Sequence, residues 1–450
     1  MRRFINLGKL PPIESVRIEE MINYFDYEYP QPTDNKPFTI TSELSNCPWN
    51  KHNYLLHLGL QGKKIAAEKL PASNLVFLLD VSGSMNEPNK LPLLVSAFSL
   101  LVDQLRSQDK VAIVVYAGAA GVVLKPTSGN KKETIKDVLE NLSAGGSTAG
   151  GEGIELAYEL AKDNFVKNGN NRVIIATDGD FNVGISSDTD LENFITKKKE
   201  EGVFLTVLGF GTGNYKDSRM ELLADKGNGN YAYIDNITEA QKVLVNEFGG
   251  TLFTIAKDVK IQLEFNPAHV KSYRLIGYEN RKLADKDFND DKKDAGEIGS
   301  GHSVTALYEI IPNEKTDKKE NLIPNDSLKY SQMVIKNNAE TNPELLTFKL
   351  RYKEPDGDKS ELIEQVILKK VLAFDQTSDD YRFTAAVAAF GQWLKKSEFK
   401  GNIDYNKIIE IAKKAQGKDE EGYRSEFVRL VKSAEKLKRV KLTDLEDDDE

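Results

Sequence analysis

The segment Leu75–Met85 passes directly from an apolar run into a loop rich in oxygen-bearing side chains. Its first five residues, Leu75–Leu79, are all apolar, which is typical of a strand buried on both faces in the parallel sheet of an α/β protein. Asp80 follows at the carboxyl end of this expected strand, where open α/β sheets bind their ligands. The segment therefore predicts an α/β fold with a ligand site at this edge of the sheet.

The spacing of Asp80, Ser82 and Ser84 places one carboxylate and two hydroxyls on a single turning loop. Gly83 allows the backbone to turn tightly between the two serines. Hard oxygen ligands suit Mg²⁺, Mn²⁺ or Ca²⁺, and Mg²⁺ usually retains waters when the protein supplies few carboxylates. The alternative is a polar turn at the end of a strand, because Ser and Asp are ordinary turn residues.

Two later segments favour the metal site over the simple turn. Residues Gly145–Gly151 form a glycine-rich stretch that contains Thr148 and precedes an expected helix. Residues Arg172–Gly179 contain a second apolar strand, which ends at Asp178. Because the carboxyl ends of parallel strands meet at one edge of a sheet, these segments would bring their polar residues beside the first loop.

These three segments, in this order, resemble the metal-ion-dependent adhesion site of von Willebrand factor type A domains. The resemblance implies that Ser82, Ser84 and Thr148 are direct ligands of Mg²⁺. It also implies that Asp80 and Asp178 act mainly through bound waters. The remaining coordination position would be filled by an acidic side chain of a partner protein.

The glycine-rich loop departs from the family pattern by one residue. The usual Gly-Gly-Thr is replaced by Gly-Gly-Ser-Thr, so that Ser147 and Thr148 are both candidates for the ligand from this loop. Thr148 is preferred because it keeps the family's distance to the apolar helix position at Ile154.

Composition narrows the class of protein further. The chain has 450 residues, 40% of them hydrophobic and 29% charged, which predicts a soluble protein of two or three domains. No apolar run approaches the roughly 20 residues of a membrane span, so no membrane insertion is expected. The net charge of -9 argues against nucleic acid as a partner, because binding phosphates requires a basic face. The single cysteine excludes an intrachain disulfide, and the four histidines lack the spacing of zinc ligands.

The region after Asp80 alternates between helical and strand patterns. Apolar residues in Leu91–Leu105 recur at helical spacing, and further helix and strand patterns alternate as far as Ile234. The strands Val111–Tyr116 and Val122–Leu124 are too close in sequence for a crossover, so they should form an antiparallel edge hairpin. The region therefore predicts a doubly wound, mostly parallel sheet of the von Willebrand A type, which is Rossmann-like.

Strand patterns of period two lie on both sides of this region. Residues Phe38–Ile40 and Tyr54–Leu60 alternate before it, and Val259–Phe265, Val304–Tyr308 and Leu346–Tyr352 alternate after it. We expect the two flanks to pair into one β-sandwich-like domain in which the α/β domain is inserted. Helical spacing returns beyond Asp379 and predicts a small carboxyl-terminal helical module.

The resulting domain plan has five parts. The segment from Pro11 to Phe25 is expected to form one short amphipathic helix. The expected parts are an amino-terminal helix with β-strands at 1–72, the von Willebrand factor A domain at 73–248, a β-rich domain at 249–376, the helical module at 377–440 and a disordered acidic tail at 441–450.

The resemblance extends over nearly the whole chain. The segments that carry it are Val16–Phe25, Phe204–Lys216, Gly249–Lys257 and Tyr381–Gly391. They are similar to bacterial von Willebrand factor A proteins with a dedicated amino-terminal segment and an uncharacterised carboxyl-terminal domain. Members of this family usually begin further upstream, often behind an export or lipoprotein signal. The resemblance therefore implies a location in the cell envelope.

Three functions follow from these observations. The first is a non-enzymatic binding module, in which the metal joins the chain to an acidic group of a partner. The second is a Mg²⁺-dependent hydrolase, which would need a nucleophile or a phosphate cradle. The sequence has no GxxxxGK[ST] motif, and Gly209–Gly213 lacks the full GxGxxG spacing. The third is a structural envelope protein whose site no longer binds metal.

Overall fold

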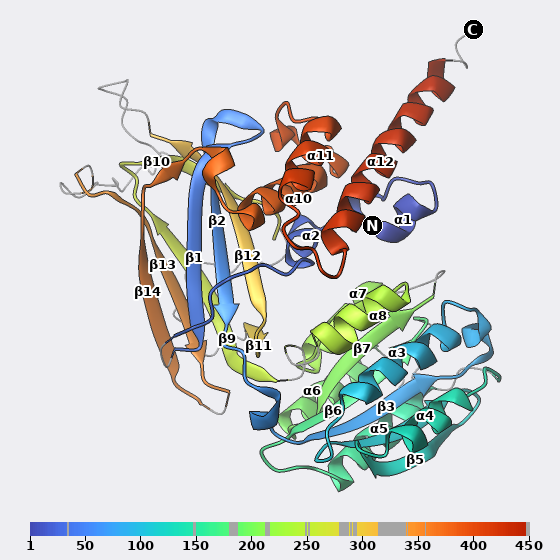
Figure 1. Cartoon of the computed structure of the whole chain (residues 1–450). Helices are drawn as coiled ribbons and strands as arrows, with labels where there is room; N and C mark the ends of the chain where they lie inside the picture. The colour runs from blue at the N-terminus through green and yellow to red at the C-terminus, as the bar shows by residue number, and fades with distance from the viewer. Residues whose placement is uncertain are drawn as a thin grey trace. The chain divides into compact units, whose positions relative to one another are not determined.

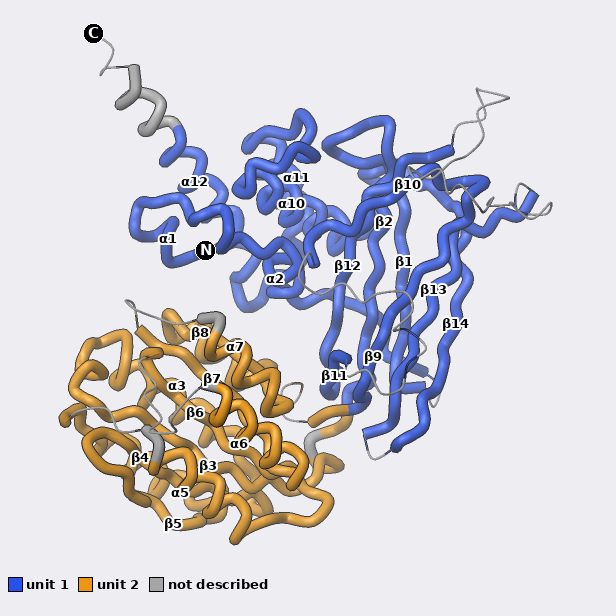
Figure 2. Tube along the Cα trace, turned by 180° about the vertical axis from the view of Figure 1, so that it is seen from behind, with its two compact units in different colours: residues 1–64, 255–450 blue, residues 65–254 orange. Residues whose placement is uncertain are grey.

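The computed structural model divides the chain into two compact units (Figure 2). One unit contains Met1–Lys64 together with Ile255–Glu450, and the other contains Ile65–Thr254. The structure describes every residue except 34–35, 147–149, 180–187, 212–216, 248–249, 251–252, 279–287, 289, 291–294, 314–338, 340, 356 and 447–450. The domain limits expected at 73 and 248 remain a prediction, and the second unit is slightly longer at both ends.

The unit Ile65–Thr254 is built on a six-stranded sheet (Figure 1). The strand order is β5-β4-β3-β6-β7-β8, and every neighbouring pair is parallel except the edge hairpin of β4 and β5. The strands are β3 (Ser73–Asp80), β4 (Lys110–Tyr116), β5 (Ala120–Ser128), β6 (Asn170–Thr177), β7 (Phe204–Phe210) and β8 (Tyr231–Ile234). The predicted doubly wound sheet and its antiparallel edge hairpin are therefore confirmed.

Helices cover both faces of this sheet because its central strands are apolar on both sides. Every residue of β3 and β6 is buried. Along β3, Phe77 packs in a core with α3, α4 and α8, whereas Leu78 packs in a second core with α5, α6 and α7. The helices are α3 (Leu91–Gln104), α4 (Lys132–Glu140), α5 (Gly150–Asp163), α6 (Asp188–Glu200), α7 (Asp217–Lys226) and α8 (Ile237–Gln241).

The other unit contains two sheets whose strands come from both flanks of the inserted unit. The first has the order β10-β12-β2-β1-β15 and the second the order β11-β9-β13-β14. The strands are β1 (Phe38–Cys47), β2 (Asn50–Gly62), β9 (Thr254–Phe265), β10 (Val270–Leu275), β11 (Gly296–Gly299), β12 (Ser303–Pro312), β13 (Glu344–Lys353), β14 (Ser360–Leu368) and β15 (Val371–Leu372). Strand β2 pairs with β1 on one side and with β12 on the other, so the expected pairing of the two flanks is confirmed.

Aromatic rings join the two sheets face to face. The ring centroids of Phe38 on β1 and Tyr352 on β13 are 5.4 Å apart. The rings of Phe265 on β9 and Tyr273 on β10 stack with centroids 4.1 Å apart. Such edge-to-face and stacked contacts are the arrangements that aromatic pairs favour in protein cores. The β-sandwich-like arrangement predicted for this domain is therefore observed.

The opposite face of the first sheet is covered by a helical module. Its central helix, α10 (Asp379–Leu394), has twelve of its 16 residues buried. The hydroxyl of Tyr381 on α10 donates to the carbonyl of Leu55 on β2 at 2.7 Å. The other helices of this unit are α1 (Arg2–Asn6), α2 (Ile18–Asn23), α11 (Tyr405–Lys414) and α12 (Tyr423–Glu446). The predicted helical module is thus present and packs against the sandwich.

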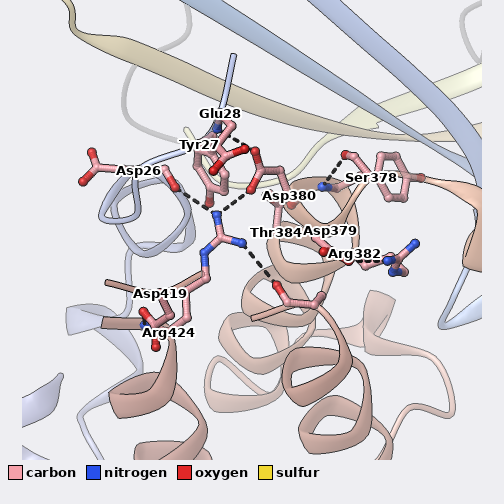
Figure 3. A network of polar contacts seen from close by, with 12 residues as sticks. Asp26, Tyr27, Glu28, Ser378, Asp379, Asp380, Arg382, Thr384, Asp419 and Arg424 are labelled. Carbon is pink, nitrogen blue, oxygen red and sulfur yellow. Dashed lines mark hydrogen bonds and ion pairs between the residues drawn. The ribbon is translucent and has the colours of Figure 1, made fainter. Parts of the chain in front are cut away.

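Arg424 links three segments of this module (Figure 3). Its guanidinium donates to the carbonyl of Asp26 at 2.9 Å and to the carbonyl of Ala415 at 3.1 Å, and it forms an ion pair with Asp380. The guanidinium also lies over the ring of Phe383, 4.7 Å from its centroid. One buried cation on α12 therefore holds the amino-terminal segment and α10 in place.

One expectation of the sequence analysis is wrong. The segment from Pro11 to Phe25 is not one helix, because Val16 and Arg17 adopt extended backbone angles and separate a 3₁₀ turn from α2. The disordered acidic tail expected at 441–450 remains a prediction: α12 continues to Glu446, and residues 447–450 lie outside the described part of the chain. The short helices not yet named are the 3₁₀ turns Ile13–Ser15, Ala67–Lys69, Gly83–Asn86, Phe374–Gln376 and Glu398–Lys400 and the π-helix Lys242–Asn246.

Candidate metal centre

The candidate site lies at the carboxyl ends of β3 and β6. These two strands are adjacent and parallel, with Leu79 opposite Ala176, so the residues that follow them emerge at the same edge of the sheet. Asp80 is the last residue of β3, and Asp178 directly follows the last residue of β6. The sheet therefore delivers both expected carboxylates to one place.

Asp80 is completely buried and is fixed by three hydrogen bonds. Its Oδ1 accepts from the backbone N–H of Ser82 at 2.9 Å. Its Oδ2 accepts from the hydroxyls of Tyr116 at 3.2 Å and Thr177 at 3.1 Å. A carboxylate offers about four lone-pair positions, so little of its capacity is left for a direct bond to a metal. This arrangement suits a carboxylate that holds a metal-bound water.

Burial also sets the electrostatics of Asp80. Removal from water raises the pKa of its carboxyl above the ordinary value, hydrogen bonds from Ser82 oppose this shift, and the charge of Asp178 adds to it. Burial therefore makes the ionised carboxylate of Asp80 less favourable than it would be in water. A divalent ion next to the loop would offset this cost, because an opposite charge favours the ionised form.

The two serine hydroxyls lie side by side on the loop that follows Asp80. Their Oγ atoms are 3.1 Å apart, with Ser82 buried and Ser84 exposed. Two backbone hydrogen bonds tie this loop to the glycine-rich loop: Gly83 N–H donates to Gly146 at 3.0 Å, and Gly145 N–H donates to Val81 at 2.8 Å. The fold therefore brings the first loop and the start of the second loop together.

The expected ligand from the second loop lies outside the described residues. Thr148 and its neighbour Ser147 both fall in the segment 147–149. Four of the five expected residues, namely Asp80, Ser82, Ser84 and Asp178, are described and come from the two strand ends. Their assignment as metal-binding residues, with Thr148, remains a proposal.

Lys90 is a member of this site that the sequence analysis missed. Its ammonium donates to Oδ2 of Asp178 at 2.8 Å and to the backbone carbonyl of Ser84 at 2.9 Å. The pair is largely buried, with 13% of the lysine side chain and 6% of the aspartate side chain exposed. Tyr116 and Thr177 were also missed. The one sequence signal for these residues was the position of Thr177 at the end of an apolar strand.

The donor set fits a hard divalent cation. It consists of hydroxyl and carboxylate oxygens, which suit Mg²⁺ or Mn²⁺ rather than the softer ions that favour sulfur and imidazole. Within the described residues, no three His, Cys, Asp or Glu side chains come together as a possible ion cage.

Fold and loop arrangement together define a von Willebrand factor type A domain inserted in a second domain. The family model described as von Willebrand factor type A domain matches residues 74–246. A model described as von Willebrand factor matches residues 1–57, and a model described as Uncharacterized protein YfbK, C-terminal, matches residues 250–437.

The chain belongs to the YfbK family. It is 44% identical to the protein described as Uncharacterized protein YfbK of Escherichia coli over 442 residues, which is 97% of this chain and 75% of that protein. It is 29% identical over 170 residues to Uncharacterized protein sll0103 of Synechocystis, covering 37% of this chain and 39% of that protein.

Solved structures of low sequence identity are also similar. The von Willebrand factor type A protein of Catenulispora acidiphila is 14% identical, with 87% of this chain and 90% of that chain covered and a TM-score of 0.43. Because this likeness is remote, the family assignment rests on the sequence matches.

The family assignment sets the general class of function. Von Willebrand factor type A domains commonly bind divalent metal ions, mediate protein–protein interactions and are generally not enzymes. Within the described part of the chain, every helix is too short or too polar to cross a membrane. The particular metal, site and partner are matters of proposal.

Proposed function

We propose that this chain is a metal-dependent protein-binding module for adhesion or scaffolding. Mg²⁺, or Mn²⁺ or Ca²⁺ in its place, is held directly by Ser82, Ser84 and Thr148. Asp80 and Asp178 hold waters of the ion. An acidic side chain of a partner protein takes the remaining coordination position, and no catalytic residue is needed.

One observation carries this proposal: two hydroxyls lie 3.1 Å apart on the loop that follows a completely buried carboxylate, at the edge of the sheet where ligands bind. The exposed position of Ser84 makes this arrangement accessible from solvent. Hydroxyls bring no negative charge, so they leave the ion under-neutralised. An under-neutralised hard cation favours an additional anionic oxygen ligand.

Calorimetric titration with Mg²⁺ and Mn²⁺ tests the metal part of the proposal. Asp80→Ala and Ser84→Ala should each lose measurable binding. Ser96→Ala is the matched control, because its hydroxyl lies on α3 in the same unit and donates to the carbonyl of Pro92 at 3.0 Å. Undiminished metal binding in Asp80→Ala would place the ion elsewhere.

Co-purification tests the partner part of the proposal. The whole chain is used to capture partners in the presence of Mg²⁺ and again in the presence of a chelator. Partners of the proposed kind should be lost on chelation and retained with Ser96→Ala. Thr148→Ala should weaken partner binding more than it weakens Mg²⁺ binding, because the second loop contributes its ligand in the partner-bound arrangement. Equal capture in chelator would contradict a metal-bridged contact.

We place this activity in the cell envelope, on the strength of the family resemblance. Fractionation of cells that express the natural gene would test this location. Recovery of the protein in the periplasmic or membrane-associated fraction is expected, and recovery solely in the cytosol would contradict it.

A further inference from the structure

Lys90 places a fixed positive charge inside the candidate metal site. It lies directly before α3 and reaches across to Asp178, which is 88 positions further along the chain. Its hydrogen bonds to the carbonyl of Ser84 and to Asp178 join the first loop to the carboxylate that follows β6. Because the pair is largely buried, solvent screens this charge less than it would on the surface.

The aliphatic part of Lys90 passes close to Gly211, the residue that directly follows β7. Gly211 has a φ of +83°, and a Cβ added there would lie 2.6 Å from Cε and 2.7 Å from Cγ of Lys90. The hydroxyl of Tyr233 on β8 donates to the carbonyl of Gly211 and holds this residue in place. The absence of a side chain at position 211 therefore allows the lysine to pass close to the backbone and reach Asp178.

The charges at the site determine what a bound metal will accept. Among the described side chains that contact one another here, the carboxylates of Asp80 and Asp178 and the ammonium of Lys90 together contribute a net charge of about −1 when all three are ionised. A divalent ion would change this to about +1, whereas the same site without the lysine would become neutral. Unit charges a few ångströms apart still interact appreciably at the effective dielectric of a protein surface, so one charge decides between these cases.

We propose that Lys90 determines the ligand specificity of this site: its ammonium lowers the affinity for the divalent ion and leaves the loaded site cationic, so that an anionic carboxylate is favoured as the outside ligand over water. This inference rests on the proposed function and deepens it. Lys90 touches no outside ligand in this account. It is a positioning and charge-setting residue, acting through Asp178.

The test uses the full-length chain and Mn²⁺ as the probe ion. Mn²⁺ binding is measured by electron paramagnetic resonance, which detects the free ion. The water that remains bound to the ion is measured by the relaxation rate of the solvent protons. Acetate serves as the carboxylate probe, with chloride at equal ionic strength as the reference. Lys90→Met removes the charge while keeping the length of the side chain, and Lys90→Arg keeps the charge.

The chain offers a matched control in its other unit. Lys353 lies 2.7 Å from Asp258, and the two side chains are 12% and 18% exposed. Lys353→Met therefore breaks a lysine–aspartate pair of similar burial that is remote in sequence from the metal loops. It should leave both Mn²⁺ and acetate binding unchanged.

Lys90→Met should bind Mn²⁺ about tenfold more tightly than wild type, because a repelling charge is gone. The displacement of bound water by acetate should require about tenfold more acetate in this variant. Lys90→Arg should resemble wild type. An unchanged Mn²⁺ affinity or an unchanged acetate dependence in Lys90→Met would overturn the inference.

A second variant guards against a failure of Lys90→Met to fold. Gly211→Ala leaves every charge in place but pushes the lysine away from Asp178, so it should shift both quantities in the same direction by a smaller factor. Circular dichroism checks the fold of each variant. If Gly211→Ala is folded and shifts neither quantity, the inference is overturned. A wild-type chain that binds no Mn²⁺ at all would instead refute the proposed function on which the inference rests.

Discussion

The guanidinium of Arg424 on α12 and the carboxylate of Asp380 on α10 form an ion pair between residues 44 positions apart in sequence (Figure 3). Asp380 also accepts the backbone N–H of Glu28 at 2.7 Å. Only 10% of the arginine side chain and 14% of the aspartate side chain are exposed. This pair connects both ends of the chain within one unit.

Replacement of Arg424 should destabilise this unit strongly. Arg424→Ala leaves the carboxylate of Asp380 largely buried without its cation, which typically costs about 3–5 kcal/mol. The matched control is Arg429→Ala on the same helix, whose partner is Glu426 at 3.0 Å and whose side chain is 62% exposed. The control should cost less than about 1 kcal/mol. Chemical denaturation of both variants decides the matter, and equal unfolding free energies would contradict this role of Arg424.

The turn before β8 should tolerate only glycine at position 229. A Cβ there would lie 1.6 Å from the carbonyl oxygen of Leu205 and 2.5 Å from its carbonyl carbon, both in the backbone of β7. Gly229→Ala must therefore move a central strand and should cost about 3 kcal/mol. Gly121→Ala is the control in the same unit, because a Cβ there meets no atom within 4 Å. Thermal unfolding should give a lower midpoint for Gly229→Ala than for Gly121→Ala. Equal midpoints would show that the backbone of β7 does not exclude a side chain at position 229.

The buried imidazole of His57 should make the stability of its unit depend on pH. Burial lowers the pKa of His57 from 6.5 to about 3, and its Nε2 lies 3.0 Å from the hydroxyl of Tyr29. Between these two pKa values the unfolded chain binds a proton that the folded chain does not, so stability falls as pH falls from 6.5 towards 3. Between pH 7.5 and pH 5 the loss from this group should be about 2 kcal/mol.

Unfolding of wild type and His57→Gln at these two pH values measures this loss. The variant has no titrating group at position 57. Its free energy of unfolding should therefore fall by about 2 kcal/mol less than that of wild type between pH 7.5 and pH 5. An identical pH dependence in both proteins would contradict the lowered pKa of His57, as would an imidazole NMR signal that titrates near pH 6.5 in wild type and is absent from His57→Gln.

Much of the fold was predictable because burial imposes simple periods on the sequence. The apolar run Leu75–Leu79 marked a strand covered on both faces, and the short gap after Tyr116 required an antiparallel hairpin. The period-two strands on both flanks predicted the pairing of β2 with β12. Strand β14 was missed, because apolar residues occur at both parities, as at Leu362 and Ile363, and give no alternation.

The candidate site was predictable only in part. Asp80 and Asp178 were expected at the strand ends because the pattern of buried strands fixes where these strands end. Lys90 was not expected, because nothing local to position 90 indicates a contact with a residue that follows another strand. Its contribution depends on the tertiary arrangement of α3, β6 and the loop after β7.

The most direct test of the metal site is the location of a Mn²⁺ ion by anomalous scattering. Crystals of the full-length chain would be grown with MnCl₂, and the anomalous difference map would be inspected at the ends of β3 and β6. If Ser82 and Ser84 bind the ion, the map will show a single strong peak at direct ligand distance from their hydroxyl oxygens. A map without a peak at these hydroxyls at saturating Mn²⁺, or with the peak elsewhere on the chain, would contradict it.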